Sequence, residues 1–219
     1  MFRPLTLTCL LLAAIAGPAP ARPPANEPVT PPPMRAVRLD APVAVDGKLD
    51  EAIWHGPPVA TRLLQSDPDE GAAATESTWV WVAWDDEALY VAARMFDSRP
   101  DSIIGQLVRR DVSTPSDRFM VFVDPFRDKR SGYYFAVNVA GVLYDGTLFN
   151  DGWDESSWDG VWQARAQRGG DHGTGWTCEI RVPFSQLRFR RGAEQVWGVN
   201  FARRLGRRSE ADYLVYQPK

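Results

Sequence analysis

Short apolar segments with a period of two residues recur through most of the chain, and they constrain its fold more than any other feature. In residues 176–182, the pattern directs Trp176, Cys178, Ile180 and Val182 toward a core and the residues between them toward solvent. Similar strands are predicted at 79–84, 89–96, 119–123, 133–139, 142–148, 161–166 and 196–201. Short strands with few helical stretches between them predict an all-β fold. We expect an antiparallel β-sandwich, jelly-roll or immunoglobulin-like, with short helical turns only.

Several local features refine this expectation. Residues 119–123 are apolar on both faces, so they predict a central strand. Asp46-Gly47 is a dipeptide suited to a tight hairpin turn, and Asp50 is placed to cap a short helical turn that ends near Trp54. A last strand is predicted from residue 213, close to the end of the sequence. We therefore expect that the domain continues beyond Lys219.

The first 35 residues divide into two segments. Residues 1–21 combine Arg3, an apolar run and an Ala-Pro-Ala site, which predicts a secretory signal peptide. Residues 22–35 hold six prolines and predict an extended linker, so the sandwich domain should span 36–219. Signal cleavage would leave Cys178 as the only cysteine, so no internal disulfide is expected. This combination predicts export to a bacterial periplasm, outer membrane or cell surface.

Residues 150–166 form the strongest candidate site. They carry three tryptophans together with Asp151, Asp154, Glu155 and Asp159. Indole faces can stack on sugar rings while carboxylates accept hydrogen bonds from hydroxyl groups. We predict carbohydrate contacts from Trp153, Trp158, Asp151, Asp154 and Glu155. The alternative is that Trp158 packs inward and the acids are solvated; Trp162 is assigned to the core.

Four blocks of the sequence, in this order, resemble family 9 carbohydrate-binding modules. They are VDGKLDEAIW at 45–54, WDDEALYV at 84–91, DRFMVFVD at 117–124 and GWTCEIRVPF at 175–184. The closest resemblance is to the domain found at the N-terminus of exported bacterial outer-membrane β-barrel proteins. It implies a sandwich fold, binding of a polysaccharide or oligosaccharide and association with carbohydrate catabolism. A C-terminal β-barrel domain is the expected covalent partner.

The resemblance also implies individual residue roles. Asn138 stands where the family has a sugar-binding asparagine. Met120 and Ala136 replace a sugar-binding glutamate and an arginine. The family places calcium ligands near Asp97 and Asp117, so calcium is the implied cofactor; a solvated acidic loop is the alternative.

Other functions have weaker support in the sequence. The formal net charge of −3 gives no reason to expect nucleic acid as a partner. The two histidines have no serine, cysteine or second histidine at a spacing typical of catalytic triads or zinc sites. A carboxylate pair for glycoside hydrolysis would have to come from Asp154, Glu155, Asp159 or Glu179. We therefore expect a non-catalytic binding module, ahead of a structural or interaction domain without a sugar site, and of a glycoside hydrolase.

Overall fold

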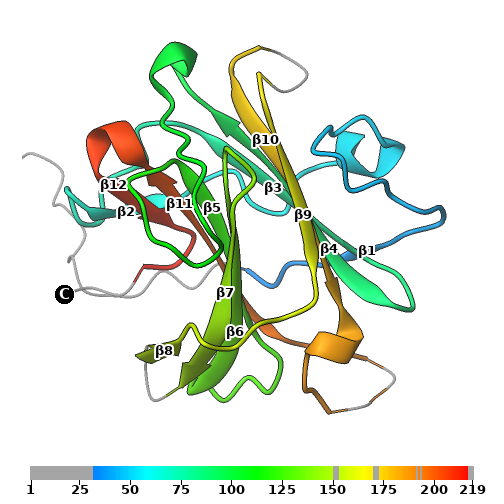
Figure 1. Cartoon of the computed structure of the whole chain (residues 1–219). Helices are drawn as coiled ribbons and strands as arrows, with labels where there is room; N and C mark the ends of the chain where they lie inside the picture. The colour runs from blue at the N-terminus through cyan, green and yellow to red at the C-terminus, as the bar shows by residue number, and fades with distance from the viewer. Residues whose placement is uncertain (1–31, 150–152, 170–172, 191, 193, 217–219) are drawn as a thin grey trace, which may run out of the picture.

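Two β-sheets pack face to face to form a sandwich (Figure 1). The structure is a computed structural model that describes residues 32–149, 153–169, 173–190, 192 and 194–216. The predicted signal peptide, most of the predicted linker and Asp151 lie outside these residues. The expected all-β sandwich is confirmed for the part of the chain that is described.

The first sheet has five strands and the second has seven. The five-stranded sheet has the order β1 (Val37–Arg38), β3 (Thr78–Trp84), β4 (Ala88–Phe96), β10 (Gly175–Pro183) and β9 (Gln163–Arg168). The seven-stranded sheet has the order β2 (Leu64–Asp67), β12 (Glu210–Tyr213), β11 (Gly198–Leu205), β5 (Arg118–Asp124), β6 (Ser131–Asn138), β7 (Leu143–Phe149) and β8 (Trp153–Glu155). All pairings are antiparallel except that of β1 with β3.

Most of the predicted strands are present, and the differences fall at the ends of the sheets. β5 lies in the middle of the seven-stranded sheet, which confirms the prediction for residues 119–123. The last described strand ends at Tyr213, where the sequence predicted a strand to begin. β1, β2 and β8 were not predicted. All three are short edge strands with polar residues, so their pairing depends on a neighbouring strand more than on an apolar pattern.

The main hydrophobic core fills the space between the two sheets. Its largest fully buried side chains include Trp176, Phe119, Phe135 and Phe201. The inward residues predicted in 176–182 are all buried, and so is Trp162. Burial of these side chains removes apolar surface from water at roughly 25 cal/mol per Å², which stabilises the stacking of the two sheets.

The helical segments in the described residues are short 3-10 turns. They are η1 (Ala52–His55), η2 (Pro100–Ser102), η4 (Phe184–Gln186) and η5 (Gly206–Arg208). The turn near Trp54 was predicted, but the cap by Asp50 is wrong: Glu51 is the N-cap residue of η1 and makes no side-chain capping bond. No helix among the described residues is long and apolar enough to span a membrane.

Residues 43–56 cover part of the outer face of the five-stranded sheet and form a second hydrophobic cluster there. Glu179 on β10 holds this segment in place. Its Oε2 accepts the backbone N–H groups of Asp46 and Gly47, both at 2.9 Å, and its Oε1 accepts Trp54 Nε1–H at 2.9 Å. The prediction that Thr177 and Glu179 face solvent is therefore wrong, because this segment buries both. Asp46-Gly47 does not join two strands; it presents N–H groups to a carboxylate.

Glu179 should make stability depend on pH. Burial raises the pKa of Glu179 to about 7 from its ordinary 4.5, against the opposing effect of its three N–H donors. Between these values the folded protein binds more protons than the unfolded chain, so this group's contribution to stability falls as pH rises from about 4.5 to about 7. Urea unfolding at pH 5 and pH 8 should reveal this fall in the wild type, and the fall should be smaller in Glu179→Gln.

The Glu179→Gln variant should also be less stable at pH 8, by about 1–3 kcal/mol, because its amide NH₂ faces N–H donors that the ionised carboxylate accepts. Glu87→Gln, which changes an exposed carboxylate at the adjacent turn, is the matched control. An unchanged pH dependence in Glu179→Gln would contradict this role for Glu179.

Candidate functional site

The predicted sugar-binding loop is only partly described. Trp153 begins β8, but its side chain lies outside the described part of the structure, as does Asp151. Asp154 and Glu155 are exposed on β8, at the edge of the seven-stranded sheet. Glu155 accepts the N–H of Ser157 at 3.2 Å. Carbohydrate contact by these residues stays a prediction.

Trp158 is half-buried and packs against the core. Its ring centroid lies 5.3 Å from that of Tyr133 and 6.0 Å from that of Phe135. Gly160 lies directly beneath the indole, since a Cβ added there would come within 2.7 Å of the ring. Through these contacts, Trp158 packs against the side of the core formed by Tyr133 and Phe135.

Asn138 lies on β6 and is fully buried. Its Oδ1 accepts the N–H groups of Ala140 at 3.0 Å and Val142 at 2.9 Å, and its Nδ2 donates to the carbonyl of Gln106 at 2.9 Å. Asn138 therefore fixes the β6–β7 turn and fastens the loop of residues 104–116 to the sheet. These bonds engage the side-chain amide of Asn138, which is the group that would have to bond to a sugar.

Asp97 and Asp117 lie in a buried ionic network between the sheets. Arg207 Nη2 lies 2.8 Å from Asp97 Oδ1, and Arg203 Nη2 lies 3.8 Å from Asp97 Oδ2. Asp117 Oδ2 accepts the N–H of Ile104 at 2.9 Å, and burial raises the pKa of Asp117. Two guanidinium groups already supply positive charge here, so a calcium ion would have to compete with them. Calcium binding stays a prediction from the resemblance.

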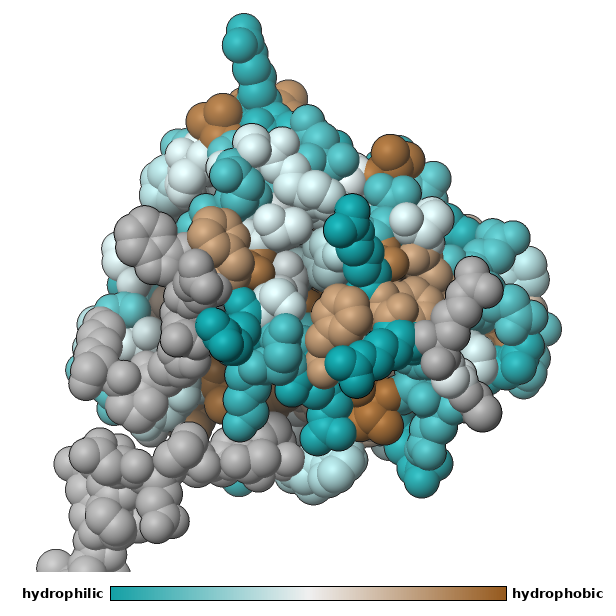
Figure 2. Space-filling model, turned by 90° about the horizontal axis from the view of Figure 1, so that it is seen from below, coloured by the Kyte–Doolittle hydropathy of each residue, from teal (hydrophilic) through white to brown (hydrophobic). Residues whose placement is uncertain are grey.

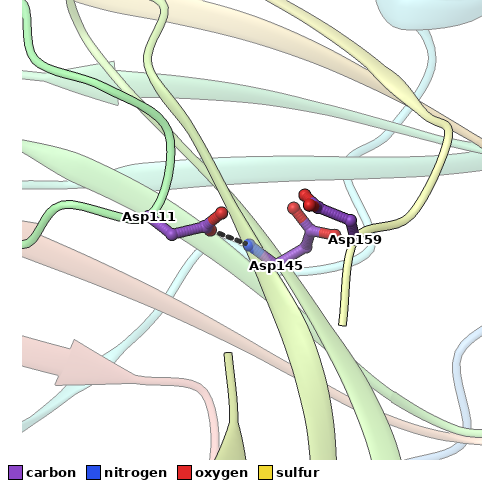
Figure 3. Close-up of side chains that lie close together, drawn as sticks. All are labelled: Asp111, Asp145 and Asp159. Atoms are coloured by element: carbon purple, nitrogen blue, oxygen red, sulfur yellow. Dashed lines mark hydrogen bonds between the residues drawn. The ribbon is translucent and has the colours of Figure 1, made fainter. Parts of the chain in front are cut away.

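Another acidic cluster brings together Asp111, Asp145 and Asp159. Their carboxylates point toward one another from the loop before β5, from β7 and from the loop after β8 (Figure 3). Arg110 lies among them, with its Nε 2.9 Å from Asp145 Oδ1 and 3.2 Å from Asp159 Oδ1. Asp145 is buried, and its other oxygen accepts the N–H of Gly160 at 2.7 Å. The cluster is an ion-pair network that joins three segments of the chain.

A row of aromatic rings crosses the outer face of the seven-stranded sheet. The ring centroid of Phe122 on β5 lies 6.5 Å from that of Tyr134 on β6 and 6.3 Å from that of Tyr213 on β12. All three side chains are half-buried. Ala202 on β11 pairs with Tyr213, and its small side chain lets the rings meet across that strand. Gly146 has the same role under Tyr134, since a Cβ there would lie 2.6 Å from the ring.

Charged residues flank this aromatic row. The guanidinium of Arg118 lies 4.4 Å from the centre of the Tyr144 ring, and Arg204 is exposed opposite it on β11. Burial, followed by the charge of Asp154, raises the pKa of Tyr134 to about 12. The phenol therefore stays neutral at physiological pH and can both donate and accept hydrogen bonds. The face thus offers apolar rings, hydroxyl groups and charges of both signs.

This row was not predicted from the sequence, although the sequence carries a signal for it. The residues that alternate with the core residues of 119–123 include Phe122, and this two-sided apolar pattern predicted only burial. One of the two apolar faces in fact carries a half-buried ring on the outer side of the sheet. A sequence that is apolar on both faces of a strand can therefore indicate a central strand, an aromatic outer surface, or both. Residues 119–123 combine the two.

Among its described residues, the end of the sandwich that carries β8 and η4 shows no concentrated group of apolar side chains that would mark a binding site. Viewed from that end, apolar residues are separated by hydrophilic ones and do not form one wide apolar area (Figure 2). Its exposed apolar side chains include Phe126, Phe149, Val161 and Val196. Scattered apolar side chains of this kind are normal for a protein surface.

The two-sheet sandwich is the fold of a family of carbohydrate-binding modules. The chain belongs to the carbohydrate family 9 binding domain-like family, whose model matches residues 45–204. This confirms the resemblance. No curated protein matches the sequence.

Solved structures share the fold at low sequence identity. A family 9 carbohydrate-binding module from Caldicellulosiruptor kristjanssonii in complex with cellotriose aligns with a TM-score of 0.52 and 18% identity, over 82% of each chain. The same organism's module in complex with glucose aligns with a TM-score of 0.52 and 17% identity, over 82% of this chain and 84% of the other. A protein from Bacteroides uniformis aligns with a TM-score of 0.51 and 13% identity, over 73% and 78%.

Replacing Trp158 by alanine tests whether this residue packs or binds. Because its ring contacts Tyr133 and Phe135, we expect the free energy of unfolding to fall by about 2 kcal/mol, less than for a fully buried tryptophan. Urea unfolding measures the change, and Trp158→Phe should restore most of it. Unchanged stability together with lost saccharide binding would contradict the packing role.

Replacing Arg203 by methionine tests the ionic network. The variant leaves Asp97 and its neighbours buried without their central positive charge, so stability should fall by about 3–5 kcal/mol. The control is Arg204→Met on the same strand, whose side chain is exposed and whose loss should change stability by about 0.5 kcal/mol at most. Equal urea midpoints for the two variants would contradict a central role for Arg203.

Proposed function

We propose that this domain binds a polysaccharide or oligosaccharide through the outer face of the seven-stranded sheet. The observation that carries the proposal is the row of half-buried rings formed by Tyr134, Phe122 and Tyr213 on the outer face of the sheet. Stacking on the C–H faces of sugars needs flat apolar rings, and specificity needs polar groups beside them. Arg118, Arg204 and the two tyrosine hydroxyls supply polar groups. Membership of the family and the complexes of the similar modules with cellotriose and glucose support the same ligand class.

In this proposal the domain binds saccharide without changing it. Glu179 is held by three N–H donors beneath residues 43–56, and Asp159 is paired with Arg110. Both carboxylates are therefore already engaged by groups of the protein itself. Any hydrolysis would then belong to a linked or partner domain. The alternative is a structural or interaction domain of an outer-membrane β-barrel protein that has no working sugar site.

The cellular setting is part of the proposal. We propose that the protein is exported to the periplasm, outer membrane or cell surface, on the basis of the predicted signal peptide at 1–21 and the proline-rich segment that follows it. Attachment to a C-terminal β-barrel domain is proposed from the resemblance alone.

Substitution of Phe122 tests the proposed binding face. Phe122→Leu keeps an apolar side chain but removes the stacking ring, so affinity for cellotriose should fall by about tenfold, equivalent to about 1.4 kcal/mol. Isothermal titration calorimetry on the purified protein measures the affinity, and urea unfolding verifies that the variant is folded. The matched control is Phe126→Leu, an exposed phenylalanine at the end of the sandwich, which should bind as the wild type does.

A panel of oligosaccharides extends this test beyond cellotriose. Failure of the wild type to bind any member of a broad glycan array would favour the structural or interaction domain. Equal affinities for the wild type and Phe122→Leu would place any binding elsewhere on the molecule.

A further inference from the structure

The opposite side of the molecule carries a depression of about 460 Å³ on the outer face of the five-stranded sheet. This volume is within the range of small-molecule binding sites. The depression lies between the segment that contains η1 and the adjoining strands β3 and β4. Its lining consists of Leu49, Asp50, Trp54, His55, Gly56, Pro58, Trp79, Trp81 and Arg94.

The three tryptophans of the depression are held in fixed positions. Trp54 Nε1–H donates to Glu179 at 2.9 Å, and Trp81 Nε1–H donates to the carbonyl of Gly56 at 2.8 Å. Both side chains are also buried, so these two residues fix the shape of the depression. The site is therefore largely formed before any ligand arrives, which reduces the entropy cost of binding.

Trp79 differs from the other two because it is 37% exposed. Its ring centroid lies 5.1 Å from that of Phe96 and 6.3 Å from that of Trp81, with an interplanar angle of 71° in both pairs. Edge-to-face contacts of this kind fix the plane of an aromatic ring. An exposed indole held rigidly at the wall of a concave site is well suited to stack on a flat apolar surface of a ligand.

The polar groups of the depression define the chemistry of that ligand. Arg94 lies with its guanidinium 5.9 Å from the centre of the Trp81 ring, and it supplies N–H donors. Asp50 supplies carboxylate oxygens that accept hydrogen bonds, and the His55 ring can donate or accept them. Both residues are exposed. The single arginine and the single aspartate of the lining carry opposite charges that offset each other. Donors and acceptors beside apolar rings, with these charges offset, fit a neutral compound with many hydroxyl groups.

We propose that this depression is a second saccharide site, specific for a neutral sugar. A pyranose ring stacks on Trp79, and its hydroxyl groups bond to Asp50 and Arg94. The site is built from residues of the five-stranded sheet and its covering segment, so it shares no residue with the aromatic row on the other sheet. The two sites can therefore be tested separately.

Calorimetric titration of four forms of the purified protein with cellotriose provides the test: wild type, Phe122→Leu, Trp79→Ala and the double variant. Xylotriose and maltotriose extend the set of neutral ligands. Trp79→Ala should weaken the binding that remains in Phe122→Leu by about tenfold or more, whereas Trp79→Phe should retain most of it. Asp50→Asn should weaken the same binding. Phe126→Ala, which removes an exposed ring elsewhere, should change nothing.

A second readout locates the contact. The indole Nε1–H resonance of Trp79, assigned by its absence in Trp79→Phe, should shift on addition of sugar in both the wild type and Phe122→Leu. Equal affinities for Phe122→Leu and the double variant, or an unshifted Trp79 resonance at saturating sugar, would overturn the second site. Binding that is lost with Trp79→Ala but unchanged in Phe122→Leu would support the second site and reject the aromatic row. Absence of binding by the wild type to all three trisaccharides would reject both sites.

Discussion

The buried guanidinium of Arg203 joins the two sheets at one end of the sandwich. It projects from β11 of the seven-stranded sheet and donates to the carbonyls of Ser77 at 3.0 Å and Phe96 at 2.8 Å, at the ends of strands in the other sheet. Burial lowers the pKa of Arg203, and the surrounding carboxylates oppose that shift. A buried cation of this kind requires acids around it. This requirement accounts for the burial of Asp97 and Asp117 beside Arg203.

Glu179 shows the same principle with the charges reversed. A carboxylate beneath residues 43–56 is tolerable only because three N–H groups converge on it, and those groups come from the segment that it holds. The covering segment is therefore fixed by one residue of β10 as well as by the apolar contacts of Trp54 and Leu49. Because this segment forms one wall of the tryptophan-lined depression, the shape of that depression depends on a buried charge whose own role is structural.

The fold was predictable from the sequence to a greater extent than the sites were. Alternation in 176–182 identified β10 and its inward residues correctly because burial between two sheets imposes a period of two on the side chains. The same rule failed for Thr177 and Glu179, since a segment more than 120 residues earlier covers them. The aromatic row was missed for a similar reason: Phe122, Tyr134 and Tyr213 come from three strands, and only the strand order brings their rings together. Sequence patterns report on local burial, whereas sites depend on contacts between distant segments.

The two aromatic surfaces lie on opposite outer faces of the sandwich, and this arrangement limits how they could cooperate. The sheets themselves stack about 10 Å apart, and side chains add to that thickness. A trisaccharide on one face therefore cannot reach the other, so short sugars would occupy the two sites independently. A long polysaccharide could engage both faces only by bending around an edge, or by presenting two neighbouring chains. Any gain in affinity from having two sites would then arise because binding at one site raises the local concentration of polymer at the other. Such a domain would distinguish an assembled polysaccharide from its soluble fragments, although each site alone would recognise the same sugar.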